Sequence, residues 1–357
     1  MTTTDLDRTA ADAFAARMTG VLNDAALALS LSIGHRTGLF DTMEDLQPST
    51  SAAIAAGAQL DERYVREWLG AMVAGHVVDY DPTTRTYVLP KEHAASLTRA
   101  AGVGNLACMA QTMAMLGSVE SEIVHCFHKG GGVPYSSFPT FHTIMAESSK
   151  AVVDAALLDG ALPLVPGLVG RLEAGMDVAD LGCGSGYAAC VMARAFPKSR
   201  FTGFDFSEEA IATARHQADA WELQNITFEV RDLTDLSMPA SFDFITTFDA
   251  IHDQAAPDRV LRGIAGALRS GGIYLCVDIA ASSDLEQNVD HPLGPFLYTI
   301  STMHCMTVSL AAGGAGLGTA WGEGVAVGML REAGFDDITV EHVEGDVMNV
   351  YYIARKA

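Results

Sequence analysis

The first apolar pattern along the chain has the period of an α-helix. Residues 10–38 are rich in alanine, and Ala26, Leu29 and Ile33 fall on one face of the helix that this spacing predicts. Gly38 is a plausible end for that helix. A helix this apolar near the start of a chain often packs on a partner subunit, so we expect a homodimer.

Shorter patterns follow. Residues 51–57 and 61–74 have helical spacing, and Asp61 is placed to cap the second of these helices. Residues 77–80 and 86–89 alternate between apolar and polar on either side of a polar turn, which predicts a β-hairpin. A helix-turn-helix followed by a hairpin indicates a winged helix.

The second half of the chain alternates between apolar strand patterns and helical patterns, which is typical of a parallel α/β sheet. The expected strands are 178–181, 200–204, 226–230, 242–248 and 273–278. Between the halves, residues 101–170 look helical, with a break at the glycines of 130–134. We therefore expect a winged-helix dimerisation domain at 1–100, a helical linker at 101–170 that roofs the active site, and a Rossmann-like α/β domain at 171–357.

Length and charge narrow the class of protein. A chain of 357 residues is too long for one typical core, and its net charge of −22 repels nucleic acid and anionic membranes. In the second helix of the expected winged helix, Arg63 and Arg66 are offset by Glu62 and Glu67. This composition favours dimerisation over DNA binding for the winged helix.

We expect no targeting signal or membrane span from the apolar pattern of the sequence. Residues 1–10 are polar and do not resemble a signal peptide, and no apolar run is long enough to span a bilayer. Six scattered cysteines fit reduced thiols better than a disulfide framework. The expectation is a cytoplasmic protein with no membrane partner.

A glycine-rich loop carries the strongest chemical signal. After the expected strand 178–181 come Gly182, Gly184 and Gly186, and an acid, Asp205, ends the next expected strand about twenty residues later. Glycines let the backbone approach a ligand, the following helix presents free N–H groups, and the acid can accept both hydroxyls of a ribose. The sequence therefore predicts a nucleotide-binding βαβ unit.

The G-x-G-x-G spacing, with Asp180 before it and Cys183 inside it, resembles motif I of the class I S-adenosylmethionine-dependent methyltransferases. The resemblance implies S-adenosylmethionine as the cofactor, with Asp205 on the ribose and Asp232 near the adenine. It also implies further cofactor contacts, namely adenine packing by Phe206 and Leu233, backbone at Phe248 near the methionine part, and Tyr135 reaching over the cofactor.

The order of winged helix, helical linker and class I domain is similar to that of the plant caffeate-type O-methyltransferases and of bacterial winged-helix methyltransferases. In the caffeate-type enzymes a His-Asp pair at the end of the fourth strand supplies the general base, and here that pair is His252 and Asp253. The plant pattern continues with Trp, whereas this chain has Gln254. Glu323 is a candidate by position for the acid that orients the histidine.

These two residues have other interpretations. His252 could lie on the surface and cap the next helix, and Asp253 could be the N-cap of a helix at 258–268 or lie nearby in the loop. Imidazole titrates near neutral pH, so a base role for His252 is the preferred hypothesis.

Two stretches rich in Met and aromatic residues, 109–141 and 291–306, are candidate walls of an acceptor pocket, although most of these residues could be ordinary core. His125, Cys126 and His128 form a close cluster, but the spacing does not match a zinc signature, so no metal is expected.

The preferred interpretation is methyl transfer to the hydroxyl of a small, fairly apolar molecule, with His252 as base. Transfer to N, S or C without an essential base is the alternative within the same class. A cofactor-sensing regulator that uses its winged helix is the alternative from another class.

Overall fold

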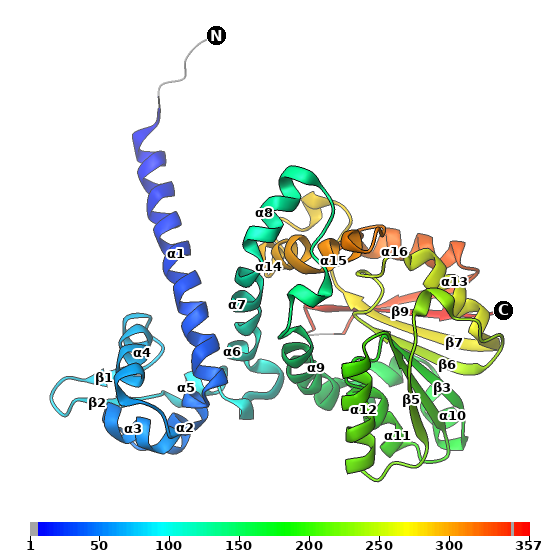
Figure 1. Cartoon of the computed structure of the whole chain (residues 1–357), viewed down its shortest axis with the longest axis horizontal. Coiled ribbons are helices and arrows are strands. Elements are labelled where there is room, and N and C mark those ends of the chain that lie inside the picture. The colour runs from blue at the N-terminus through cyan, green and yellow to red at the C-terminus, as the bar shows by residue number, and fades with distance from the viewer. Residues whose placement is uncertain (1–5, 344–345) are drawn as a thin grey trace. The chain divides into compact units, whose positions relative to one another are not determined.

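The computed structural model describes residues 6–343 and 346–357 (Figure 1). Residues 1–5, expected as the start of the first domain, lie outside the described residues. The chain forms two compact units that divide between Gly117 and Ser118. Most of the expected linker, from residue 118 onward, therefore belongs to the same unit as the α/β domain. The three-part division at residues 100 and 170 stays a prediction.

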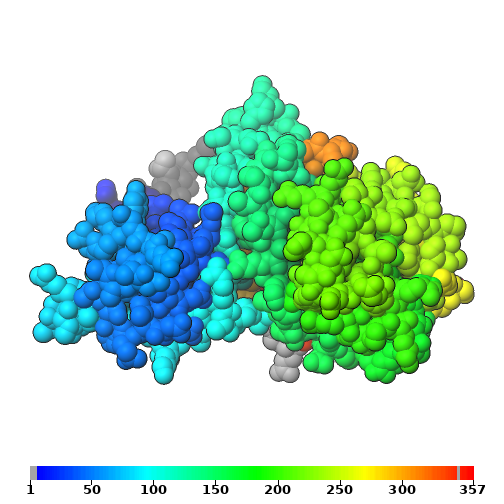
Figure 2. Space-filling model, turned by 60° about the horizontal axis from the view of Figure 1, so that its bottom comes forward, coloured from blue at the N-terminus to red at the C-terminus, as the bar shows by residue number. Residues whose placement is uncertain are grey.

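The first unit is a helical domain with a small hairpin. The expected helices and hairpin are confirmed, but the two strands are shorter than the alternation predicts. The hairpin tip stands out from the surface of this unit (Figure 2). The elements are α1 (Arg8–Arg36), α2 (Leu39–Asp45), α3 (Ser51–Ala58), α4 (Glu62–Ala74), β1 (Asp79–Asp81), β2 (Thr86–Val88), α5 (Lys91–Ala94), η1 (Arg99–Gly104), α6 (Leu106–Met109) and α7 (Gln111–Ser118), which crosses the boundary.

The core of the first unit lies between α1, α2 and α4. Phe40 and Trp68 pack edge to face with ring centroids 5.3 Å apart, and the Trp68 indole N–H donates to the carbonyl of Ser30 at 2.9 Å. Asp61 caps α4 as expected, accepting from the backbone N–H groups of Arg63 and Tyr64. Only the C-terminal part of α1 joins this core, and its earlier turns extend beyond the neighbouring helices of the unit (Figure 1).

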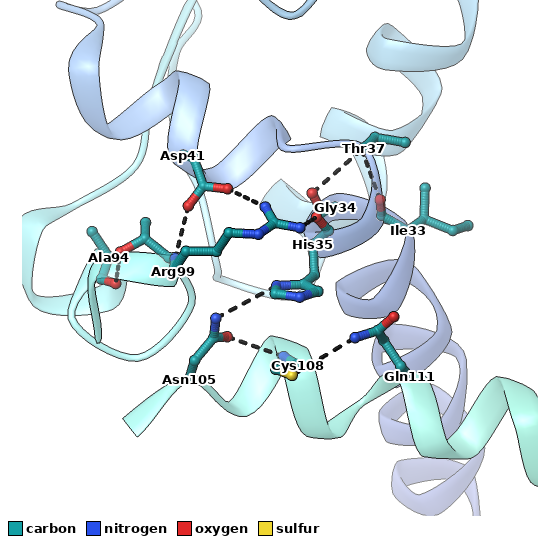
Figure 3. A network of polar contacts seen from close by, with 11 residues as sticks. Ile33, Gly34, His35, Thr37, Asp41, Ala94, Arg99, Asn105, Cys108 and Gln111 are labelled. Carbon is teal, nitrogen blue, oxygen red and sulfur yellow. Dashed lines mark hydrogen bonds and ion pairs between the residues drawn. The ribbon is translucent and has the colours of Figure 1, made fainter. Parts of the chain in front are cut away.

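A polar network fastens η1 and α6 to the end of α1 (Figure 3). The Arg99 guanidinium forms an ion pair with Asp41 and donates to the carbonyl of His35 at 3.0 Å. The Asn105 side chain caps α6 by accepting from the backbone N–H of Cys108 at 3.0 Å. The Arg99 bond satisfies a carbonyl group at the end of α1, and the Asn105 cap satisfies a backbone N–H group at the start of α6.

The second unit is built on a seven-stranded sheet with the order β5-β4-β3-β6-β7-β9-β8. The first five strands in this order are parallel, whereas β9 is antiparallel to both of its neighbours. The strands are β3 (Asp177–Leu181), β4 (Arg200–Asp205), β5 (Ile226–Val230), β6 (Phe242–Phe248), β7 (Leu268–Ile279), β8 (Asp337–Glu341) and β9 (Asn349–Arg355).

Helices cover both faces of this sheet. Alternate residues of the strands face opposite layers, so Ala179 belongs to the core under α13 and α16, and Val178 to the core under α10 and α11. The helices and turns of the unit are α8 (Glu120–Lys129), η2 (Tyr135–Ser137), α9 (Phe141–Ala156), η3 (Leu157–Ala161), η4 (Leu162–Leu164), α10 (Leu168–Ala174), α11 (Tyr187–Ala195), α12 (Glu208–Ala220), η5 (Leu233–Asp235), α13 (Pro257–Ala267), η6 (Leu285–Gln287), α14 (Gly294–Ile300), η7 (Ser301–Cys305), α15 (Met306–Ala311) and α16 (Gly322–Glu332).

One strand starts earlier than the sequence predicts. The glycines Gly271 and Gly272 were expected to precede the fifth strand, but β7 already begins at Leu268. Gly271 has φ of +71°, and the pairing with β6 shifts register near this point. The glycines therefore form an irregularity inside the strand, where a residue without Cβ takes the left-handed conformation.

Within the described residues, no single helix has the length and apolar content needed to cross a bilayer, although the bent pair Phe141–Leu164 and Leu168–Ala174 passes on these two criteria together.

Candidate active site

The expected site residues of the second unit gather at one edge of the sheet. Parallel strands place their carboxyl ends together, so the ends of β3, β4, β6 and β7 bring Leu181, Asp205, Phe248 and Asp278 to the same edge. The strand order reverses beside β3, from which β4 and β6 lie on opposite sides. Ligands of open α/β sheets bind in the crevice at such a reversal.

The loop after β3 needs glycine at two positions for steric reasons. At Gly182, where φ is +71°, a Cβ would lie 2.6 Å from the Cβ of Ala250. At Gly186, where φ is also +71°, a Cβ would lie 2.5 Å from the Phe228 ring. Gly184 faces open space. Gly186 is also the N-cap of α11 and provides no capping side chain, so backbone N–H groups are left to meet a ligand.

Asp205 lies against this loop. Its side chain accepts from the backbone N–H of Gly184 through Oδ2 and from that of Ser207 through Oδ1, each at 2.9 Å, and the residue is only 7% exposed. A carboxylate oxygen has two lone-pair sites, so each oxygen can still accept from one hydroxyl. The donor set therefore fits the ribose of S-adenosylmethionine.

Asp180 lies near the end of β3, and Cys183 lies inside the loop that follows. Asp180 is buried and accepts from the Thr246 hydroxyl at 2.9 Å. Burial raises the pKa of Asp180 to about 7, against the opposing hydrogen bond from Thr246. Burial also raises the pKa of the Cys183 thiol well above its usual value, which keeps this thiol protonated and unreactive.

The remaining expected cofactor residues differ in their surroundings. Phe206 is 53% exposed beside Asp205, whereas Leu233 is buried in the core under α13. Asp232 caps η5 through Oδ1, which accepts from the backbone N–H and the hydroxyl of Thr234, both at 2.8 Å. Phe248 is half-buried at the end of β6. Their contacts with the cofactor stay predictions.

His252 is a buried imidazole held by an acid. Its Nδ1 lies 2.7 Å from Asp278 Oδ1, and its side chain is 5% exposed. The interpretation of His252 as a surface residue is therefore wrong. Asp278 Oδ1 also accepts from the backbone N–H of Ile279 and from the Trp321 indole, which fixes the carboxylate in place.

The partner of His252 differs from the one expected. Glu323 is exposed and lies 4.0 Å from His342 on the surface, so its assignment as the orienting acid is wrong. Asp278 takes that place because β7 runs parallel to β6 and ends beside it. The strand pattern predicted the end of β7, but the pairing of β6 with β7 is needed to see that the two residues meet.

Opposing effects set the pKa of His252. Burial lowers it, but the charge of Asp278 and hydrogen bonds with Asp278 and the Cys305 thiol raise it well above the usual value. Once the imidazolium of His252 has lost its proton, the neutral ring is therefore a strong proton acceptor. Since Asp278 holds Nδ1, the nitrogen that remains for a ligand is Nε2.

Asp253 is half-buried beside His252 and accepts from the Tyr135 hydroxyl through Oδ2. Burial raises the pKa of Asp253, although the charge of His252 and the bond from Tyr135 oppose the shift. The N-cap of α13 is Ala256, so the interpretation of Asp253 as that cap is wrong. Burial and the charge of Asp253 raise the pKa of the Tyr135 phenol well above its usual value.

Two further residues near His252 were not recognised as site residues from the sequence. Asp249, just after β6, has φ of +50°, and its Oδ1 lacks a hydrogen-bond partner among the described residues. Burial, followed by the charge of Asp278, raises the pKa of Asp249 to about 7. His304, which lies in the candidate wall 291–306, is fully buried. No local pattern distinguishes either of them.

Aromatic rings from one expected wall surround His304. Tyr135, Phe138 and Phe141 each lie with ring centroids 4.0 to 5.3 Å from the imidazole. Tyr135 also lies 5.5 Å from Phe206, so this wall reaches toward the expected cofactor site. By contrast, Phe127 is 77% exposed on α8 and does not join the cluster.

Two protein families match the chain. Residues 172–298 match the family described as "Methyltransferase domain", and residues 25–99 match the "Rv2258c-like winged HTH domain". The second domain is thus an S-adenosylmethionine-dependent methyltransferase domain of class I. The whole chain combines this domain with a winged helix at its N-terminal side, and S-adenosylmethionine is the cofactor that the combination indicates.

Curated relatives match only part of the chain. The chain is 33% identical over 105 residues to the malonyl-[acyl-carrier protein] O-methyltransferase of Bacillus cereus, covering 29% of this chain and 37% of the relative. It is 37% identical over 110 residues to the trans-aconitate 2-methyltransferase of Deinococcus radiodurans, covering 30% of this chain and 39% of the relative. The chain thus matches well under half of the length of these relatives.

A solved structure extends the likeness of fold to the whole chain. Human N-acetylserotonin methyltransferase, solved in complex with S-adenosylmethionine, aligns with a TM-score of 0.69 at 18% identity, covering 100% of both chains. At this identity the alignment shows a shared fold and no shared substrate.

Proposed function

We propose that the protein methylates a hydroxyl oxygen of a small, fairly apolar molecule, with His252 as the general base. The observation that carries this proposal is the buried His252–Asp278 pair at the carboxyl edge of the sheet, with 2.7 Å between Nδ1 and Oδ1. A carboxylate on Nδ1 holds the imidazole in the tautomer whose Nε2 can accept a proton.

Methyl transfer to oxygen needs positioning and removal of one proton. When bound, S-adenosylmethionine supplies a methyl group activated by a positively charged sulfur. Nε2 of His252 would take the proton of the acceptor hydroxyl as its oxygen receives the methyl group, and the sulfur of the cofactor would keep the electron pair of the bond that breaks. The Cys305 thiol beside His252 is a weak hydrogen-bond partner that an acceptor hydroxyl can replace.

The residues that we propose to hold the cofactor follow the edge of the sheet. Asp205 would accept the ribose hydroxyls. The loop through Gly182, Gly184 and Gly186 would let the cofactor approach the backbone, next to Asp180 and Cys183. Asp232, Phe206 and Leu233 would border the adenine. Phe248 and Tyr135 would border the methionine part, where the ring of Tyr135 also helps to exclude water.

Two observations favour oxygen as the methylated atom and an apolar molecule as the acceptor. The malonyl-[acyl-carrier protein] relative carries O-methyltransferase in its name. The aromatic rings of Tyr135, Phe138 and Phe141 lie within one cluster beside Asp253 and His304. In the alternative, methylation of N, S or C without an essential base, a buried and oriented His252 would have no role in the chemistry.

We further propose that the chain is a homodimer and that its winged helix does not bind nucleic acid. In α4, Arg63 pairs with Glu67 and Arg66 with Glu62, so its cations are matched within the helix. The net charge of −22 acts against binding to phosphates. The exposed apolar side chains of α1 favour a second copy of the chain as the partner.

The proposal is tested in two measurements. Calorimetry with S-adenosylhomocysteine should show binding to the wild type, with loss of most of that affinity in Asp205→Ala. With an aromatic hydroxyl compound that the wild type methylates, His252→Ala should lower the rate of methyl transfer by about 10² to 10⁴-fold and leave cofactor affinity unchanged.

His342→Ala is the matched control, because His342 is exposed and pairs with Glu323 instead of with the residues around His252. A His252→Ala variant that turns over as fast as the wild type at neutral pH would remove the base from the mechanism. A well-folded wild type that does not bind S-adenosylhomocysteine would remove the cofactor.

A further inference from the structure

His304 is a fully buried imidazole, and neither of its nitrogens has a hydrogen-bond partner among the described residues. A polar group buried without a partner costs stability, and native structures contain few of them. His304 lies in η7, which is one turn of π-helix between α14 and α15. Such turns are rare and often occur at functional sites. Both observations suggest that a ligand supplies the missing partner.

The ring of His304 is held in one orientation by aromatic neighbours. Phe141 stacks on it with centroids 4.0 Å apart and an angle of 13° between the planes. Phe138 and Tyr135 approach nearly edge-on, at 4.7 Å and 5.3 Å. The nitrogens are thus presented in a fixed direction inside an aromatic wall, which suits the recognition of a flat ligand.

His304 and the proposed base belong to the same site. Cys305 follows His304 directly, and its thiol forms a hydrogen bond with His252. Tyr135 contacts the His304 ring and donates to Asp253, the neighbour of His252. A molecule that reaches Nε2 of His252 is therefore close to His304 as well.

The charge state of His304 limits what it can bind. Burial, followed by the charges of His252 and His142, lowers its pKa to about 3. The ring is therefore neutral at working pH and offers one N–H donor and one nitrogen acceptor. A neutral imidazole suits a hydroxyl or carbonyl oxygen. A carboxylate would gain no cation from His304, and it would have to lose its water beside a neutral ring.

Building on the proposed hydroxyl methylation, we propose that His304 binds a second oxygen of the acceptor, close to the hydroxyl that is methylated. The acceptor class is then a flat aromatic compound with two neighbouring oxygens, either two hydroxyls or a hydroxyl and a carbonyl. His252 takes the proton of the reacting hydroxyl, and His304 fixes the orientation of the ring through the other oxygen.

A matched pair of probes tests this role. Calorimetry on the full chain, saturated with S-adenosylhomocysteine, compares 2,3-dihydroxynaphthalene with 2-naphthol, which lacks only the second hydroxyl. The wild type should bind the diol about tenfold more tightly than the mono-hydroxyl compound, as expected for one hydrogen bond to a buried partner. 3-Hydroxy-2-naphthoate, which carries a carboxylate instead, should bind more weakly than the diol.

Variants of His304 test whether this side chain causes the preference for the diol. In His304→Leu the tenfold difference should vanish, whereas in His304→Gln, which keeps a donor and an acceptor, most of it should remain. His342→Leu on the surface should behave as the wild type. A diol preference that persists in His304→Leu, equal affinities for both probes in the wild type, or no binding of either probe to cofactor-loaded protein would each overturn the proposal.

Turnover separates this inference from the methyl-transfer proposal. Methylation of the diol that is unaffected by His304→Leu would contradict the role of His304 and leave the role of His252 intact. Binding that depends on His304 without any methylation of the diol would contradict hydroxyl methylation and leave His304 as a ligand-binding residue.

Discussion

The proton affinity of His252 follows from two opposing effects. Removal of the ring from water disfavours the imidazolium, but the Asp278 carboxylate 2.7 Å from Nδ1 favours it, and the second effect prevails. A base must be free of its proton before it can act. The active fraction of the enzyme should therefore grow as the pH rises through the raised pKa of His252.

This gives a pH prediction. In the wild type, kcat/KM for a hydroxyl acceptor should rise with pH and level off only above pH 6.5, the usual pKa of histidine. In Asp278→Asn, the largest effect that opposes burial is lost, so the pKa of His252 should fall and the rising part of the profile should move to lower pH. The measurement is kcat/KM between pH 5 and pH 10 for both proteins.

The acceptor hydroxyl also ionises, and its titration should be the same in both proteins. A profile that does not move in Asp278→Asn would therefore mean that the acceptor, and not His252, sets the pH dependence. A Glu323→Gln variant serves as control, because Glu323 is exposed and pairs only with His342 among the described residues.

Sequence reasoning worked well for residues whose role depends on their own segment. The positions of Asp205 and His252 follow from the ends of strands that the apolar pattern already predicts. Asp278 and His304 could not be identified in this way, because their roles depend on which strands are neighbours and on a π-helical turn. Neither of these leaves a periodic signal in the sequence.

At the scale of elements, α1 combines a long helix with an exposed apolar face. Leu22 is 72% exposed, Leu29 47% and Ile33 51%, and their spacing places them on one side of the helix together with Ala26. Helices in folded proteins gain most of their stability from packing of an apolar face. A second copy of this helix is the partner that a homodimer would supply.

The prediction is that the double variant Leu22→Asp and Leu29→Asp weakens the dimer. Two charges in an apolar interface would have to be desolvated, so light scattering at micromolar concentration should give twice the chain mass for the wild type and a mass near that of one chain for the variant. Ala13→Asp adds a charge on the opposite side of α1 and should stay dimeric. A wild type with the mass of one chain would contradict the homodimer.

The sequence pattern predicts some helices and strands more closely than others. The sequence predicts α1, α4 and β3 to within about two residues, because each has a clear apolar period and a cap or glycine at its end. It does not predict the last two strands, β8 and β9, beyond the helix-to-strand junction at Leu330–Phe335. Their antiparallel pairing depends on contacts between distant segments.

At the scale of the whole molecule, several buried groups bind protons more tightly in the folded state than in the unfolded chain. Burial raises the pKa of Asp180 and Asp249 to about 7, and the Asp278 charge raises that of His252 despite its burial. The acids with lowered pKa values lie nearer the surface and titrate below pH 4, namely Asp81, Asp154, Asp243 and Asp258.

The free energy of unfolding should therefore fall as the pH rises from 5 to 8. Between pH 4 and 7 the folded state holds protons on Asp180 and Asp249 that the unfolded chain has released, so each group contributes a loss on the order of 1.4 kcal/mol per pH unit. His252 adds to the loss as the pH rises through its raised pKa. The net charge of −22 also makes self-repulsion stronger as these acids ionise.

Urea denaturation without cofactor at pH 5, 6, 7 and 8 measures this slope. Asp180→Asn keeps an acceptor for Thr246 but removes one titrating group, so its stability should depend less steeply on pH than that of the wild type. Glu173→Gln, at an exposed position, should leave the slope unchanged. If the wild type were as stable at pH 8 as at pH 5, the carboxyl groups of the site could not be protonated near neutrality. In that case the edge of the sheet would hold several buried negative charges, and a cationic group would be needed there to balance them.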